Sequence, residues 1–335
     1  MSSSQDGSLE RADALERAGH LAEAADGYAS AMEAARSVGD RRLLSEALGR
    51  LSALRHRLGD AQARQLAESS LQIATEESHD RLKAQALNLL GAMDLDNGNL
   101  GRARTLLLQA WAVSDEYPEL RGRIGQNLGI LANIQGDWPG AITHYLRSAQ
   151  AFEAAADERR CAIAYHNLGM LSADRQRWSQ ADSYYRKSLT LAIKAGDQSL
   201  RALCHVNYAE VHLVRQQFDR VQDSVNTALA YFEQQGLDRE RAAAYRLLGV
   251  AHRENGQFEL AESMLLLSLK FAIVTHDPLA KAEALQELAR LNQAQGLKSK
   301  ALELLIEARA LYTQVEARVE LQEVATAIAE LEVTA

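Results

Sequence analysis

The amino-acid sequence predicts an all-α protein made of about eight helix-turn-helix repeats and a C-terminal capping helix. The first observation is composition: strong helix formers such as alanine, leucine, glutamate and arginine dominate, and the 335 residues include only 3 prolines. The second is a pattern that recurs at a regular interval along nearly the whole chain. The third is apolar spacing of three and four residues within each unit, which is typical of a helix that buries one stripe.

A small residue recurs at one position of the pattern. With Ala181 as the anchor, the equivalent positions are Ala24, Ala63, Ala103, Ala141, Val221, Ala261 and Ala301. Successive anchors are separated by about 40 residues throughout. The second unit is the poorest match, because its turn is one residue shorter and it lacks a Leu-Gly pair in register. A period this regular indicates one repeat array rather than separate globular domains.

Each unit is expected to form two helices separated by a turn. The first helix carries a Leu-Gly pair, or a near relative, seven residues before the turn, where a small residue lets two helices approach closely. These pairs are Leu90-Gly91, Leu128-Gly129, Leu168-Gly169, Tyr208-Ala209, Leu248-Gly249 and Leu288-Ala289. The second helix buries a stripe that includes Ala181 and Tyr185. Pro118, Pro139 and Pro278 fall in expected first helical turns, where a missing N–H costs nothing.

The array is expected to cover residues 8–315, after a disordered polar tail over residues 1–7. Residues 316–335 are expected to form a capping helix and tail, because this segment continues the period as a first helix without a partner. The residues expected to face back onto the eighth repeat are Leu321, Val324, Ile328 and Leu331.

Aromatic, cysteine and histidine residues are all interpreted as packing residues. The aromatic residues that recur just after the turn, and are expected in the core, are Trp138, Trp178, Phe218 and Phe258. Cys161 and Cys204 form no CxxC pair and are expected to be small buried residues. His205 and His212 bracket Glu210 at a spacing that allows a metal site, but both occupy aromatic positions of the repeat, so no metal is expected.

These residues resemble the tetratricopeptide repeat family. Tyr165, Leu168 and Gly169, followed by Ala181 and Tyr185, match its W-x2-L-G and A-x3-F pattern. The period is longer than the family's usual length of about 34 residues, and the family's terminal proline is absent. The variant is therefore similar to the longer repeats of kinesin light chain and of bacterial peptide-sensing regulators. The resemblance covers roughly residues 8–333. It implies a right-handed solenoid whose first helices line a concave face, in a family of scaffolds with many partners.

Several classes of function are not expected. The sequence has no GxxxxGK[ST], GxGxxG, HExxH or GxSxG motif, so we expect no enzyme, no catalytic residues and no cofactor. A net charge of -8 without a clustered basic surface argues against nucleic-acid binding. The chain begins without a signal-peptide pattern, and no apolar run approaches the roughly 18 residues that span a bilayer. We therefore expect a cytoplasmic protein without membrane insertion.

One recurrence asks for a functional explanation. Asn127, Asn167 and Asn207 occupy the same position of three successive first helices, although asparagine is a mediocre helix former. A carboxamide can bind both the C=O and the N–H of an extended peptide. Helices about 10 Å apart would hold about every third residue of a chain that advances about 3.3 Å per residue. In the resembled repeats this position commonly contacts bound peptide. The alternative is that these asparagines bond only to neighbouring helices.

The flanking residues predicted to bind peptide are Arg123, His166, Met170, Glu210, Arg246 and Arg253. Arg246 lies where the asparagine series stops, and an arginine there offers a two-pronged contact to a ligand carboxylate. We expect a non-enzymatic scaffold that binds a peptide or an extended protein segment in its concave groove. The alternative is a sensory or regulatory subunit whose superhelix changes shape on binding a signal peptide or small ligand.

Overall fold

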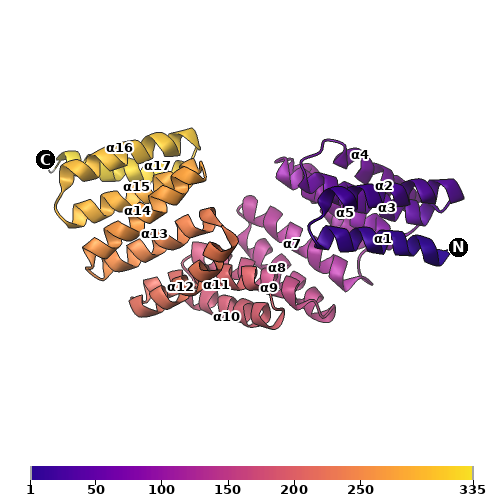
Figure 1. Ribbon diagram of the computed structural model, residues 1–335, viewed down its shortest axis with the longest axis horizontal. Coiled ribbons are helices and arrows are strands. Elements are labelled where there is room, and N and C mark those ends of the chain that lie inside the picture. Colours follow the sequence, from indigo (N-terminus) through magenta and orange to yellow (C-terminus); the bar gives the residue numbers. More distant parts are fainter. Residues whose placement is uncertain (1, 334–335) are drawn as a thin grey trace. The chain divides into compact units, whose positions relative to one another are not determined.

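The computed structural model describes residues 2–333 and confirms the all-α prediction. These residues form seventeen helices and no strand. Their contacts divide the chain into two compact units, Met1–Leu171 and Ser172–Ala335, where the sequence predicts one array. The boundary falls inside the ninth helix, and the two units are described separately below (Figure 1).

The helices of the N-terminal unit are α1 (Ser2–Arg17), α2 (Leu21–Val38), α3 (Arg41–Arg57), α4 (Ala63–Glu76), α5 (Asp80–Asp96), α6 (Leu100–Ala112), α7 (Pro118–Ile134), α8 (Trp138–Ala154) and most of α9 (Glu158–Asp174). Those of the C-terminal unit are α10 (Trp178–Lys194), α11 (Gln198–Val214), α12 (Phe218–Gln235), α13 (Asp238–Glu254), α14 (Phe258–Val274), α15 (Pro278–Ala294), α16 (Lys298–Gln314) and α17 (Arg318–Val333).

From α1 to α8 and from α10 to α17, each helix packs on the next helix in the chain, and first helices of the same unit also contact one another. In the N-terminal unit α3 touches α5, and α5 touches α7 (Figure 1). In the C-terminal unit α11, α13 and α15 make the corresponding contacts. Each unit therefore has a row of first helices, which we call the first-helix row, with the second helices packed behind it.

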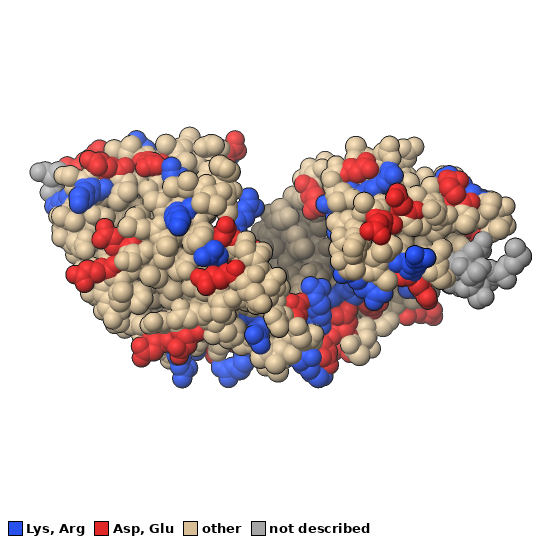
Figure 2. All heavy atoms as spheres, in the orientation of Figure 1, with Lys and Arg blue, Asp and Glu red and all other residues tan. Residues whose placement is uncertain are grey.

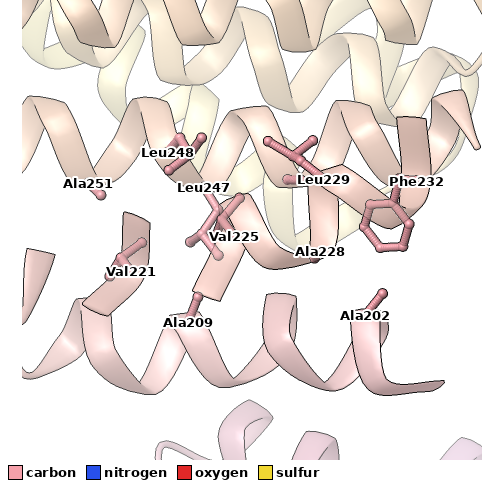
Figure 3. Close-up of a cluster of buried hydrophobic side chains, with 11 residues drawn as sticks. Ala202, Ala209, Val221, Val225, Ala228, Leu229, Phe232, Leu247, Leu248 and Ala251 are labelled. Atoms are coloured by element: carbon pink, nitrogen blue, oxygen red, sulfur yellow. The ribbon is translucent and has the colours of Figure 1, made fainter. Parts of the chain in front are cut away.

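The repeat register read from the sequence is confirmed by burial. All eight anchor positions are at most 3% exposed. In the C-terminal unit Val221 and Val225 of α12 are buried in a cluster with Ala209 of α11 and Leu248 of α13 (Figure 3). The anchor is small because it lies where the two helices of a repeat and the next repeat meet.

The glycines of the Leu-Gly pairs permit close helix contacts, as predicted. A Cβ added to Gly129 would lie 2.6 Å from the ring of Tyr145, and one added to Gly249 would lie 2.5 Å from Leu265 Cγ. The turn can use another residue type, because Gln216 takes the left-handed conformation (φ 54°) that Gly256 takes one repeat later (φ 75°). Pro118 begins α7 as expected.

The N-terminal end of the array differs from the sequence prediction, and the C-terminal helix buries the predicted face. Helix α1 begins at Ser2, inside the segment 1–7 for which disorder is predicted, because a helix packed through Leu9 and Ala12 propagates outward at little cost; residue 1 lies outside the described residues. At the other end α17 buries Val324 and Ile328 against the cluster of the eighth repeat, which is the face that the sequence assigns to this contact. Residues 334–335 lie outside the described residues.

The two cysteines predicted to be buried are buried, whereas the four aromatic residues predicted for the core are not fully buried. Trp178, Phe218 and Phe258 are half-buried and pack against the core clusters. Cys161 and Cys204 are 1% and 0% exposed. Burial raises the pKa of the Cys204 thiol to about 11, which keeps it protonated at neutral pH. Trp138, however, is 39% exposed, so its assignment to the core is wrong. As the first residue of α8, it begins the helix at the surface.

Candidate functional site

A cavity of about 810 Å³ opens along the first-helix row of the N-terminal unit. Helices α1, α3 and α5 and the start of α7 line it, together with Tyr28 of α2 and Ser70 of α4. Its lining includes the small residues Gly49, Ala53 and Ala86, which leave room between the helices. The cavity is therefore a product of the repeat stack, in which first helices from four successive repeats border the same space.

Helix α5 supplies one polar wall. The lining residues of this helix include Arg81, Gln85, Asn88, Leu89 and Ala92. Their spacing of three and four residues places them on one face of the helix. A cation, two carboxamides and a short apolar surface thus follow one another along α5.

Helices α1 and α3 contribute a charged cluster to the lining. Arg50 forms ion pairs with Asp13 and, at 2.7 Å, with Glu46. Burial lowers the pKa of Arg50, and the positive charge of Arg81 lowers it further. The two arginines therefore lie close enough to repel each other across the cavity.

Tyr28 anchors the acidic residues of this cluster. Its hydroxyl lies 2.5 Å from Asp13 Oδ1 and 2.6 Å from Glu16 Oε2, and Arg57 pairs with Glu16. Burial, followed by the hydrogen bond to Glu16, raises the pKa of Tyr28. The phenol therefore stays protonated and holds both carboxylates in place.

Of the predicted site residues, Arg123 lines the cavity. Its guanidinium is 46% exposed and contacts Glu119 at 2.8 Å, and Arg160 of α9 contacts the same carboxylate at 2.7 Å. Arg123 thus lines the cavity and has an acidic partner, Glu119, on its own helix.

The three asparagines do not form one observed ladder. Asn127 is half-buried, and its Nδ2 donates a hydrogen bond to Oδ1 of Asn88 at 2.9 Å. This bond to a neighbouring helix is the alternative that the sequence left open, and it connects Asn127 to the cavity through Asn88. Asn167 is half-buried on α9 in the N-terminal unit, whereas Asn207 is half-buried on α11 in the C-terminal unit.

His166 and Met170 lie one turn apart on α9 but differ in exposure. His166 is 8% exposed, and burial lowers its pKa to about 4, so the imidazole is neutral at pH 7. Met170 is 43% exposed. Of the two, Met170 is exposed to solvent, and His166 packs inside the unit.

The predicted arginines of the C-terminal unit pair with acidic residues of the next first helix. Arg253 of α13 contacts Glu287 of α15 at 2.7 Å, and the two side chains are only 12% and 8% exposed. Arg246 of α13 lies 3.3 Å from Glu283 of α15. Glu210 is half-buried, and burial raises the pKa of its carboxyl group. These two arginines therefore form ion pairs that connect α13 to α15 within the protein itself.

Of the two histidines considered for a metal site, His212 makes a contact that is repeated by His252 in the next repeat. The ring of His212 contacts Gln217 at 3.0 Å, and His252 makes the same contact with Gln257 at 2.7 Å. Each glutamine precedes the following helix, so the pair connects the two helices of a repeat. Among the described residues no group of three or more His, Cys, Asp and Glu side chains is placed to hold a metal ion.

The sequence analysis missed the residues that form the cavity. Arg50, Arg81, Gln85 and Asn88 belong to the second and third repeats, whereas the asparagine recurrence directed attention to the fourth to sixth. The third repeat also has an asparagine, Asn88, in its first helix, but it lies three residues before Gly91, whereas Asn127 lies two residues before Gly129. This shift of one position kept Asn88 out of the asparagine series.

Acidic and basic side chains are intermixed on the face drawn in Figure 2. Within residues 2–333 no helix has the length and apolar character needed to cross a membrane.

The fold and the first-helix row define an α-helical repeat protein. Residues 123–194 match the tetratricopeptide repeat family model. The resemblance read from the sequence is thereby confirmed. No curated protein matches the sequence.

Solved structures share the fold at low sequence identity. A signal transduction ATPase with numerous domains and a tetratricopeptide repeat sensor, from Pyrococcus horikoshii, is 14% identical with a TM-score of 0.66, covering 97% of this chain and 55% of that chain. A Rap protein complexed with competence and sporulation factor is 12% identical with a TM-score of 0.59, covering 100% and 99%. The Cut9-Hcn1 heterotetramer is 17% identical with a TM-score of 0.62, covering 95% and 55%.

Proposed function

We propose that this chain is a non-enzymatic interaction scaffold that binds a peptide, or an extended segment of another protein, along the first-helix row of its N-terminal unit. The observation that carries the proposal is the cavity of about 810 Å³, which first helices from four repeats border. The family supports a scaffold. The Rap protein with its bound factor and the Cut9-Hcn1 assembly are proteins of the same fold that hold a partner.

The chemistry of the cavity suits an extended backbone. Gln85 and Asn88 present carboxamides, and each such group has an acceptor and two donors for the C=O and N–H groups of a peptide. Asn127 occupies one lone pair of Asn88 Oδ1 and holds that side chain in one orientation. Leu89 and Ala92 provide apolar contact beside them. A peptide can therefore gain both backbone hydrogen bonds and side-chain burial in this cavity.

The proposed binding site includes predicted site residues of the N-terminal unit but not those of the C-terminal unit. Arg123 and Asn127 belong to the cavity or its edge, and Asn167 and Met170 extend the first-helix row along α9. The corresponding residues of the C-terminal unit, Asn207, Glu210, Arg246 and Arg253, stay a prediction. For Arg246 and Arg253, binding a ligand carboxylate would require competition with Glu283 and Glu287.

A second candidate function is a sensory or regulatory subunit that changes shape on binding. It is favoured by the likeness to a protein with a tetratricopeptide repeat sensor and to a Rap protein with a bound factor. Small-angle scattering with and without the bound peptide separates the two functions. A sensor changes its radius of gyration on saturation with peptide, and a rigid scaffold does not.

The test of the proposed function is affinity capture with a variant whose cavity is filled. Ala92→Trp places a large side chain in the lining, and Ala112→Trp makes the same change at an exposed position of α6 in the same unit. Partners captured by the wild type should be retained by Ala112→Trp and lost by Ala92→Trp, with both variants folded by circular dichroism. A synthetic segment of the partner should then compete for binding.

Equal capture by both variants would show that the partner binds elsewhere. Loss of the partner by both variants at unchanged melting temperature would show that the exposed face of α6 also contributes, and that the cavity is not the site on its own.

A further inference from the structure

The cavity contains a cation without an acidic partner. Arg50 is paired with Glu46, and Arg123 is paired with Glu119. Arg17, which also lines the cavity, donates a hydrogen bond from Nε to the backbone carbonyl of Asp13 at 3.2 Å. Arg81 lines the same cavity, but no carboxylate of the described residues lies within ion-pair distance of it. Glu116, which is exposed on the segment before α7, also lines the cavity and forms no ion pair with Arg81. A positive charge is thus available to a ligand.

Arg81 and Arg50 place two positive charges in the lining of the cavity. Arg81 lies close enough to Arg50 for the two guanidinium groups to repel each other, and Arg50 is only 34% exposed. Arg81 is itself exposed, so solvent weakens this repulsion, but two neighbouring like charges still raise the free energy of the protein. An anion placed between the two arginines would relieve this repulsion and gain charge-assisted hydrogen bonds.

We propose that Arg81 binds an anionic side chain of the peptide ligand, so that the cavity selects peptides with an acidic or phosphorylated residue. The inference rests on the proposed function and deepens it. Gln85 lies one turn farther along the same face of α5, so a peptide whose anion contacts Arg81 has its backbone beside Gln85 and then Asn88. Arg81 therefore fixes the position of the peptide along the first-helix row.

The test uses pools of fluorescein-labelled heptapeptides with one fixed central residue and mixed flanking residues. The central residue is glutamate, phosphoserine, glutamine or lysine, and binding to the full chain is measured by fluorescence anisotropy. The wild type should bind the glutamate or phosphoserine pool about tenfold more tightly than the glutamine pool, the gain expected of a hydrogen bond to a charged group. The stronger of the two anionic pools identifies the source of the negative charge.

Arg42 provides a matched control for Arg81. Both are exposed and both are the second residue of a first helix, but Arg42 of α3 does not line the cavity. Arg81→Ala should abolish the preference for the anionic pools, and Arg42→Ala should preserve it. Arg81→Glu should shift the preference to the lysine pool.

Two results would overturn the inference alone: equal binding of the glutamate, phosphoserine and glutamine pools by the wild type, or a preference for anions that survives in Arg81→Ala. If no pool binds to the wild type at all, the proposed peptide-binding function fails together with the inference. The two failures are therefore distinguishable.

Discussion

The carboxamide of Asn127 donates a hydrogen bond to Oδ1 of Asn88, 2.9 Å away, and so connects first helices of the third and fourth repeats. The sequence places Asn127 in a series with Asn167 and Asn207, but the observed partner comes from outside that series. Asn88 lines the cavity, whereas Asn127 supports it from the next helix. The bond therefore gives Asn127 a positioning role toward the cavity.

This relationship is tested by a double-mutant cycle. Asn88→Ala, Asn127→Ala and the double variant are compared with the wild type by urea unfolding. Because both side chains are half-buried and water can replace part of the bond, we expect a coupling energy of about 0.5 to 1 kcal/mol. Strictly additive effects of the two single variants would show that the hydrogen bond contributes nothing to stability.

The neutral His166 predicts a loss of stability in acid. Its pKa is lowered by burial from 6.5 to about 4, so the unfolded chain binds a proton that the folded chain excludes. The free energy of unfolding is therefore unaffected by this group well above about pH 6.5 and falls as the pH drops toward 4. Between pH 7 and pH 5 this histidine alone should cost about 2 kcal/mol.

The control for this prediction comes from the repeat itself, because Val206 occupies the equivalent position of the next repeat. His166→Val should reduce the loss of stability between pH 7 and pH 5 relative to the wild type, measured by urea unfolding at both values. A residual loss is expected from His144, His205 and His212, whose pKa values burial also lowers. An unchanged loss in His166→Val would mean that this imidazole titrates normally in the folded protein.

Helix α17 provides a test of capping. Val324 is fully buried against the cluster that contains Tyr312, whereas Val319 on the same helix is 70% exposed. Val324→Asp should detach α17, lower the melting temperature and cause aggregation, because the apolar face of the eighth repeat then meets water. Val319→Asp makes the same chemical change at the surface and should melt like the wild type. If Val324→Asp is equally stable and monodisperse, α17 does not act as a cap.

Much of the fold follows from local patterns. The constant interval between anchors such as Ala181 and Val221 determines the repeat register, and both residues are fully buried. The small residue at Gly129 predicts the close contact with Tyr145 that the structure shows. Such features depend on spacing within one repeat, which a sequence displays directly. Trp138 is more exposed than the aromatic residues at the equivalent position of later repeats. Its exposure depends on how much of its ring the neighbouring helices cover, which the repeat pattern does not show.

The site could be predicted only in part, because its charges are paired between repeats. Arg253 and Glu287 belong to different repeats, and nothing in the repeat pattern says that they meet. Nothing in the sequence distinguishes Arg81 from any other surface arginine. Its position in the cavity and its lack of an ion-pair partner can be recognised only from the structure. Of the predicted site residues Arg123 lines the cavity, and the cavity itself was not predicted from the sequence.

The most direct test of the central claim is photo-crosslinking of the captured peptide to the cavity. A benzoylphenylalanine at Gln85 projects from the lining of α5, and the same group at Gln65 lies on the exposed surface of α4 in the same unit. On irradiation with saturating peptide, we expect a crosslinked product at position 85 and none at position 65, measured by mass spectrometry of the digested complex. A peptide that binds at unchanged affinity to both labelled proteins but crosslinks at neither position, or only at position 65, would contradict binding in the cavity of the N-terminal unit.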